Sequence, residues 1–235
     1  MRPAPRCGAA QSRLRLWRGR EWHARKKSLA YFSNMYMIAI MRNANHTVRT
    51  SAKEASHERI VSAASRAIRR SGYDGPGVAD IMKEAGLTHG AFYAHFESRE
   101  AMLAEAAGRA CADSAALAAE AVASVPPEQA LTYLLHAYLS RENLAQVERG
   151  CPLAALGSET VRQAPEVRRV TTRYVKEMVD LIARQSPDWG QAGVHERALV
   201  TVATMVGTLL LARVVDEPAL SDSLREAALK HLPIA

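Results

Sequence analysis

The stretch of residues 79–96 constrains the fold of this chain more than any other part, because its apolar residues are spaced for two short helices around one small core. These apolar residues are Ile81, Ala85, Leu87, Phe92 and Phe96. Gly86 falls where the chain must turn sharply between the helices, and glycine tolerates the positive φ that such a turn favours. The pattern predicts a helix-turn-helix, whose second helix is shaped to enter the major groove of DNA.

The second helix of this pattern is expected to face outward with Thr88, His89, Gly90, Ala91 and Tyr93. The Thr88 hydroxyl is placed to cap the helix, and a capped N-terminus also attracts an anion such as a backbone phosphate. Gly90 and Ala91 have almost no side chain, so the helix can approach base edges closely, and the Ala91 methyl suits contact with a thymine methyl. From spacing alone, an ordinary helical hairpin with a glycine turn remains the alternative.

A longer pattern surrounds this motif, from His57 to Leu103. Its elements are Arg59-Ile60-Val61, Gly72-Tyr73-Asp74, Asp80-Ile81, Ala85-Gly86-Leu87-Thr88, Phe92-Tyr93-Ala94-His95-Phe96 and Ser98-Arg99-Glu100-Ala101-Met102-Leu103. The segment resembles the DNA-binding domain of the TetR/AcrR family of transcriptional regulators. The resemblance implies a homodimer whose recognition helices bind double-stranded DNA and which a small molecule releases from its operator.

The resemblance also implies roles for individual residues when they are carried over by position. Base-edge or groove contacts would come from His89, Gly90 and Ala91, and phosphate contacts would come from Thr88, Tyr93, His95 and Arg99.

Three positions depart from the usual family pattern. Pro76-Gly77 stands where a phosphate-binding hydroxyl is common, so only backbone amides can serve there. Met82 replaces a small alanine and Ile68 replaces a phenylalanine, and we expect both to be core changes that a helical domain tolerates.

Net charge alone would mislead about where DNA binds. Residues 1–50 hold eleven Lys or Arg against one acid, Glu21, a local balance of +10. Because the whole chain carries +7, the remaining 185 residues sum to −3. Attraction to phosphates in the folded part must therefore come from local placement. The side chains that we expect to supply it include Arg66, Arg69, Arg70 and Arg99.

Residues 1–50 are predicted to be a disordered basic extension. Residues 1–27 are rich in Arg, with Pro, Gly and Ser, a composition too poor in core-forming residues to fold alone. The run at 28–41 is too short and too polar to span a membrane, so we expect no membrane partner. Internal methionines suggest that part of the segment is a mis-assigned or dispensable start. If the segment is present, it could add nonspecific phosphate contacts.

The chain beyond residue 97 is predicted to be helical throughout, which makes the fold class all-α. Residues 196–215 are apolar nearly all round, without a charge from Ala198 to Ala212, and we interpret this helix as buried in protein. Together with a last helix at about 220–232, the resemblance implies a four-helix dimer interface, and two-fold symmetry implies a palindromic operator. The alternative is that both helices only complete a monomer core.

No pattern typical of catalysis or metal binding occurs in the sequence, so we expect no enzyme activity, no cofactor and no metal. Cys7, Cys111 and Cys151 are too far apart for a metal-ligand pair or a disulfide framework, which fits the cytoplasm. Gly150-Cys151-Pro152 places Cys151 as the N-cap of a helix, where a thiolate is favoured. We hypothesise that Cys151 senses oxidants or electrophiles, and the alternative is a half-buried packing residue.

The effector site can be located only by the resemblance, which implies a cavity among the helices after the DNA-binding domain. Its predicted lining is Tyr133, His136, Tyr138, Tyr174 and Met178, with Arg141 and Met205 as further candidates.

The sequence therefore predicts three parts: an extension at 1–50, a three-helix DNA-binding domain with a helix-turn-helix at 51–97, and a helical ligand-binding and dimerisation domain at 98–235. The predicted function is a repressor that binds a palindromic operator as a homodimer and is released by a small molecule or electrophile. Two alternatives remain open. One is a nonspecific DNA-coating or architectural protein that uses the basic extension, and the other is a dimeric interaction module without a DNA role.

Overall fold

The computed structural model describes residues 52–232, and all regular structure within that range is helical. The first helix in this range covers residues 52–71. The others are α2 (Val78–Glu84), the 3-10 helix η1 (His89–Ala94), α3 (Arg99–Ala123), α4 (Pro127–Tyr138), α5 (Arg141–Ala145), α6 (Pro152–Thr160), α7 (Pro165–Arg184), α8 (Val194–Val214) and α9 (Pro218–His231). The all-α fold class is confirmed.

The described residues limit what can be said of the predicted domains. Ser56–Ala235 group into one compact unit, so the predicted division between 97 and 98 stays a prediction. The predictions for the basic extension and for Cys7 lie outside the described residues.

Gly86 ends α2 through its backbone conformation. Its φ is +70°, its amide donates to the Lys83 carbonyl, and the Leu87 amide donates to the Met82 carbonyl. These two hydrogen bonds form a Schellman motif, which satisfies carbonyls that a helix end otherwise leaves unpaired. The predicted glycine turn between the two helices is therefore present.

The second helix of the motif differs from its predicted form. Residues His89–Ala94 form a 3-10 helix, and Thr88 is its N-cap residue but its hydroxyl makes no capping hydrogen bond. The Ala91 amide, which a capping hydroxyl would bind, already donates to the Thr88 carbonyl. A short segment of glycine, alanine and aromatic residues forms this tighter helix readily, because 3-10 turns occur mostly in short pieces. The prediction that Thr88 caps by its side chain is wrong.

One apolar cluster supports the helix-turn-helix and includes residues far along the chain. It contains the completely buried Ile68 and Met82, so both departures from the family pattern are core residues, as expected. Leu156 of α6 and Val167 of α7 belong to the same cluster. The core beneath the motif is therefore closed partly by helices of the second half.

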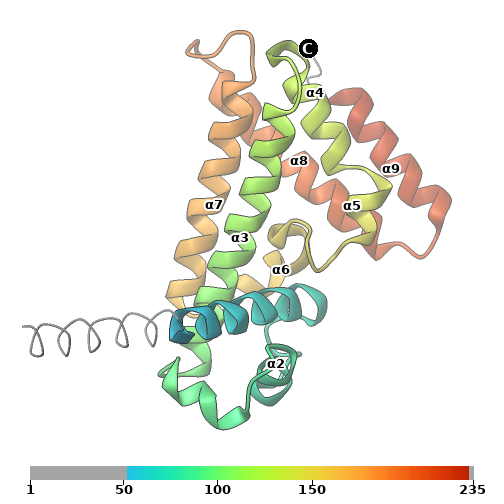
Figure 1. The fold of residues 1–235 in the computed structure, drawn as a ribbon. Helices are drawn as coiled ribbons and strands as arrows, with labels where there is room; N and C mark the ends of the chain where they lie inside the picture. Colours follow the sequence, from blue (N-terminus) through green and yellow to red (C-terminus); the bar gives the residue numbers. More distant parts are fainter. Residues whose placement is uncertain (1–51, 233–235) are drawn as a thin grey trace, which may run out of the picture. The chain divides into compact units, whose positions relative to one another are not determined.

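A second apolar cluster lies among the helices that follow. α3 packs along α7, α4 packs on α3, and α8 packs on both α7 and α9 (Figure 1). Ser98 caps α3 by accepting a hydrogen bond from the Ala101 amide at 3.1 Å, and α4, α6, α7 and α9 all begin with a proline at or near their first position. These starts agree with the sequence signals for helix boundaries.

α8 buries one face and leaves the other in contact with solvent. Val202, Met205 and Leu209 are buried, whereas apolar residues on its other side are exposed: Leu199, Val200, Leu211 and Val214. Within residues 52–232, α8 is the one helix with the length and hydropathy of a membrane span, a test that core helices of soluble proteins also pass. The interpretation of α8 as buried in protein therefore holds for one face only in this single chain.

Candidate functional site

The surface of η1 is open to solvent over the residues expected to meet DNA bases. Thr88, His89 and Gly90 are exposed, and a Cβ on Gly90 would meet no atom within 4 Å. Tyr93 is 74% exposed, while Phe92, whose ring centroid lies 5.3 Å from that of Tyr93, is buried. The buried Phe92 and Phe96 therefore anchor η1 in the core, and the opposite side of η1 faces solvent.

The remaining predicted DNA contacts are less accessible. Ala91 and His95 are partly buried, and the His95 ring lies 5.8 Å from the His57 ring between centroids. The Arg99 guanidinium donates to the Tyr73 carbonyl, so it also ties α3 to the end of the first helix. Gly77 is the N-cap of α2 and offers no hydroxyl, as the Pro76-Gly77 departure suggested. The roles of these residues toward phosphates stay predictions.

Three arginines of the first helix are paired with acidic residues rather than free. Arg66 forms an ion pair with Glu84 at 2.9 Å, and Arg70 pairs with Glu84 at 3.3 Å and with Glu148 at 2.9 Å. Arg69 is buried and lies 3.6 Å from Asp113. The prediction that these three side chains attract phosphates is wrong, because each already has an acidic partner.

Two exposed cations close to the motif were not singled out from the sequence. Lys83 lies in the last turn of α2, and Arg59 lies in the first helix with its Nη1 atom 3.7 Å from the position of a Cβ on Gly86. Neither forms an ion pair within the described residues, and only the helical phase of each residue could have indicated its exposure. Both cations are therefore available to a phosphate near the turn.

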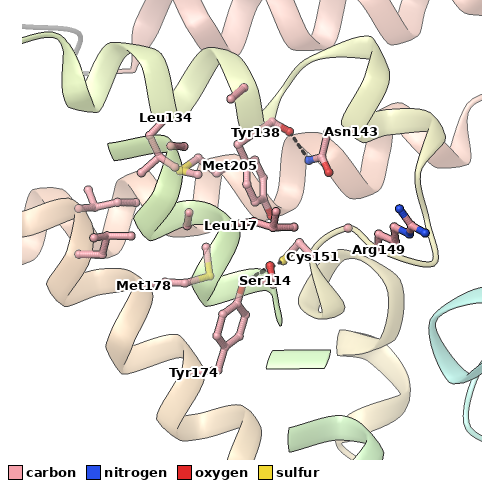
Figure 2. Close-up of a pocket in the computed structure, with 16 residues that line it drawn as sticks. Ser114, Leu117, Leu134, Tyr138, Asn143, Arg149, Cys151, Tyr174, Met178 and Met205 are labelled. Carbon is pink, nitrogen blue, oxygen red and sulfur yellow. Dashed lines mark hydrogen bonds between the residues drawn. The ribbon is translucent and has the colours of Figure 1, made fainter. Parts of the chain in front are cut away.

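A cavity of about 150 Å³ lies within the helices of the second half (Figure 2). Its wall contains side chains of α3, α4, α7 and α8 and the segment that leads into α6. The lining residues are Ser114, Leu117, Ala118, Ala121, Leu134, Ala137, Tyr138, Asn143, Arg149, Gly150, Cys151, Tyr174, Met178, Leu181, Ile182 and Met205.

The cavity contains some of the predicted lining residues and excludes others. Tyr138, Tyr174 and Met178 lie on its wall, and so does Met205. Tyr133 and His136 are exposed and do not line it, and Arg141 instead pairs with Asp222 on the outside. For this cavity those three predictions are wrong. The helical stripe of Leu131, Leu134 and Leu135 carried the missing signal, because it places Tyr138 inside and Tyr133 outside.

Hydroxyl and thiol groups gather at one end of this cavity. The Tyr174 hydroxyl donates to Ser114 Oγ at 2.7 Å and lies 3.9 Å from Cys151 Sγ (Figure 2). The Tyr138 hydroxyl is buried near the Cys151 thiol and has no nitrogen or oxygen partner. Burial is the main reason that the pKa values of Tyr138 and Tyr174 lie well above the ordinary value, so both phenols stay protonated donors at neutral pH.

Cys151 occupies the predicted N-cap position of α6, but its environment differs from the expected one. The thiol makes no capping hydrogen bond, and the residue is only 2% exposed. Cys151 is fully buried rather than half-buried. Because it forms part of the cavity wall, a reagent would reach its thiol from the cavity. Its reactivity stays a hypothesis.

Two separate hydrogen bonds join α6 and the segment before it to the first helix and to the residues that follow this helix. Arg69 Nη1 donates to the Gly150 carbonyl at 3.3 Å, and Gly150 lines the cavity next to Cys151. The Tyr73 amide donates to Glu159 of α6 at 2.8 Å. The segment that leads into α6 is therefore bonded to the helix that supports the helix-turn-helix.

Residues 52–232 contain no group of three or more His, Cys, Asp or Glu placed to hold an ion.

Comparisons with known proteins agree with this arrangement. The family profile described as "Bacterial regulatory proteins, tetR family" matches residues 60–106. The uncharacterized HTH-type transcriptional regulator Rv0196 of Mycobacterium tuberculosis is 28% identical over 174 residues, which cover 68% of this chain and 86% of that protein.

Solved structures share the fold at low sequence identity. The reduced form of NemR from Escherichia coli has a TM-score of 0.65 at 19% identity and covers 76% of this chain and 95% of its own. A TetR transcriptional regulator from Chloroflexus aurantiacus has a TM-score of 0.65 at 23% identity, with 77% and 96% covered. These two structures support the helical fold.

Proposed function

Because the chain belongs to the TetR family of bacterial regulatory proteins, we propose that this transcriptional regulator is a repressor that binds a palindromic operator as a homodimer and leaves it when a small effector binds. The observation that carries the DNA-binding part is the open face of η1, held from below by Phe92 and Phe96. A surface this exposed, with an unobstructed Gly90 at its centre, can approach base edges in the major groove.

A charge placed on this face tests DNA binding directly. In Gly90→Glu a carboxylate would face the phosphates, and we expect affinity for selected operator DNA to fall on the order of 100-fold, or about 2.7 kcal/mol. The operator would first be identified by selecting genomic fragments with the purified protein and mapping the protected bases. The matched control is Gly157→Glu in α6, where a Cβ also meets no atom within 4 Å. Equal affinity of both variants would overturn the proposal.

Salt titration distinguishes the repressor from the DNA-coating alternative. A sequence-specific protein retains a large ratio of operator to random-DNA affinity as salt rises, whereas a coating protein loses both together. The alternative depends on the basic segment 1–50, which lies outside the described residues. A ratio near one for the full chain would favour the coating protein, and absence of binding to either DNA would favour the interaction module.

The exposed face of α8 supports the proposed homodimer. Val200 is 65% exposed on this face, and pairing of two such apolar faces across a two-fold axis would remove them from water. Val200→Arg would bury a charge at that contact, so we expect the dimer dissociation constant to rise at least about 100-fold. Val161→Arg is the matched control, because Val161 is also 65% exposed but lies at the end of α6. Sedimentation equilibrium measures both, and a dimeric Val200→Arg protein would contradict this interface.

Release by an effector requires that the ligand favour one conformation over the other. A ligand in the cavity would contact Gly150, whose carbonyl is bound by Arg69, and the first helix would move with it. The proposed released form is one in which the two recognition helices no longer match the operator spacing.

An electrophile is a second proposed effector, through the Cys151 thiol in the cavity wall. Cys111 is a natural comparison, because burial raises the pKa of its thiol to about 12 and keeps it protonated at neutral pH. We expect a small electrophile such as N-ethylmaleimide to modify Cys151 at least about tenfold faster than Cys111 and to release DNA. Full release in Cys151→Ser would end the hypothesis.

Two further parts of the proposal follow from family membership. Regulators of this family are generally not enzymes, and we propose that this chain works without catalysis and in the cytoplasm, where its DNA target is accessible.

A further inference from the structure

The end of the cavity near α4 presents hydrogen-bond donors. The Tyr138 ring projects from α4 toward Cys151, and its buried hydroxyl lacks a nitrogen or oxygen partner (Figure 2). A buried hydroxyl without a partner is unfavourable, so a ligand oxygen that accepts from it would remove that penalty. The lining includes no Asp or Glu, so nothing in the wall would repel an anion at that end.

A half-buried cation lies beside two residues of the cavity wall. Arg213 of α8 donates through Nη2 to the Asn143 carbonyl at 2.8 Å and through Nε to the Leu144 carbonyl at 3.1 Å, while its Nη1 atom is buried without a partner. No acid pairs with Arg213 among residues 52–232. A guanidinium remains charged in proteins, and a buried charge without a counter-ion is unfavourable.

Arg213 and the cavity share two wall residues. Asn143 accepts from Arg213, and a Cβ on Gly150 would lie 2.9 Å from Arg213 Nη2, and both residues line the cavity. Burial lowers the pKa of Arg213, and Tyr138 and Cys151 are close enough to influence it. Arg213 does not itself line the cavity, but it contacts Asn143 and Gly150 in the same wall that contains Tyr138.

The first amides of α6 add to the positive potential there. Cys151 is the N-cap of α6 and does not cap it with its side chain. The first amides of a helix have no partner within the helix, and the helix dipole favours negative charge at this terminus. Arg149, exposed at the rim, adds a further positive charge.

The rest of the cavity is apolar and small. Leu134, Met178 and Met205 form this part of the wall (Figure 2), and Ile182 also lines the cavity. A dry apolar cavity of roughly 150 Å³ is known to hold one benzene molecule, which sets the size of the ligand body.

On the premise that the protein responds to an effector, as proposed above, we infer that this effector is a small monocarboxylate with an apolar body about as large as one benzene ring. Its carboxylate would accept a hydrogen bond from the Tyr138 hydroxyl and would be attracted by the positive charge of Arg213. Its body would contact Leu134, Met178 and Met205.

Calorimetric titration of the purified full-length protein without DNA tests the charge of the ligand. Benzoate, benzamide and benzylamine share one ring and differ in head group. We expect benzoate to bind with a dissociation constant below about 1 mM, at least about tenfold more tightly than benzamide, and benzylamine to show no binding. Hexanoate serves as a linear carboxylate of similar size and shows whether the body is a ring or a chain. Binding of benzamide or benzylamine as tight as that of benzoate would overturn the inference.

Two tyrosine variants locate the binding. Tyr138→Phe keeps the ring and removes the hydroxyl, and we expect it to weaken benzoate binding at least fivefold. Tyr133→Phe removes an exposed hydroxyl from the same helix and should leave benzoate binding unchanged. Arg213→Gln should weaken benzoate binding further, and Tyr138→Phe covers the case in which that variant fails to fold. Unchanged binding in Tyr138→Phe would overturn the inference.

DNA binding is measured separately, so the two proposals can fail independently. A protein that binds its operator but neither benzoate nor hexanoate would overturn the carboxylate inference and leave the regulator intact. A protein that binds benzoate but no DNA would overturn the proposed function and leave the ligand site intact.

Discussion

The helix-turn-helix and the cavity differ in how their functional groups are held. At η1, the exposed groups expected to meet DNA are close together in sequence, and Phe92 and Phe96 support them from the core. In the cavity, the polar groups are buried and come from helices far apart in the chain, as Tyr138, Cys151 and Tyr174 do. A surface that reads DNA is thus specified by local sequence, whereas a cavity that selects a ligand is specified by packing.

Arg69 connects the two regions, and its removal should have the largest effect on stability. Its side chain is 2% exposed and donates to the Gly150 and Ser65 carbonyls. Arg69→Met would remove both hydrogen bonds and the ion pair with Asp113 and would take from the Gly150 carbonyl its donor on the first helix, so we expect the free energy of unfolding to fall by about 2–3 kcal/mol. Denaturant unfolding measures this change.

Arg66 on the same helix provides the control for Arg69. The Arg66 and Glu84 side chains are 34% and 30% exposed, and a pair at such a site contributes about 0–1 kcal/mol. Arg66→Met should therefore cost less than Arg69→Met. Equal losses would mean that the hydrogen bonds to the cavity wall do not hold the first helix in place.

The DNA-binding region depends on one backbone conformation, which gives an effect of intermediate size. Gly86 has a φ of +70° and ample space for a Cβ, whose nearest neighbour would be Arg59 at 3.7 Å. Gly86→Ala should therefore destabilise through backbone strain alone, by about 1–2 kcal/mol. In α6, Gly157→Ala should instead stabilise by up to about 1 kcal/mol, because alanine favours a helix. Thermal unfolding of both variants gives opposite shifts if the turn needs its glycine, and shifts of the same sign would contradict this account.

The same difference between local and tertiary control explains which predictions from sequence succeeded. The turn at Gly86 and the Ser98 cap depend on neighbouring residues, so the sequence alone predicts them correctly. The prediction of free phosphate-binding charges on Arg69 and Arg70 was wrong, because their partners Asp113 and Glu148 are distant in sequence. Pairing of that kind depends on the packing of the second half against the first.

One helix of the cavity wall, α4, shows both what the sequence can predict about the cavity and what it cannot. Helical phase places Tyr138 on the inner side of α4 and Tyr133 on the outer side, and this much could be predicted from the apolar stripe. The sequence could not predict that the Tyr138 hydroxyl and the buried Nη1 atom of Arg213 lack hydrogen-bond partners. That depends on which polar groups the other helices place beside them.

The smallest predicted effect is on the free energy of unfolding when either cavity tyrosine loses its hydroxyl. The change has opposite signs for Tyr138 and Tyr174. The Tyr138 hydroxyl has no nitrogen or oxygen partner, so Tyr138→Phe should stabilise the free protein by about 1 kcal/mol through removal of a buried unpaired group. The Tyr174 hydroxyl donates to Ser114, so Tyr174→Phe should destabilise by about 1 kcal/mol. Denaturant unfolding without ligand measures both. Destabilisation by Tyr138→Phe would show that its hydroxyl is already satisfied in the free protein, and the cavity would then lack the donor that distinguishes it from an ordinary packing defect.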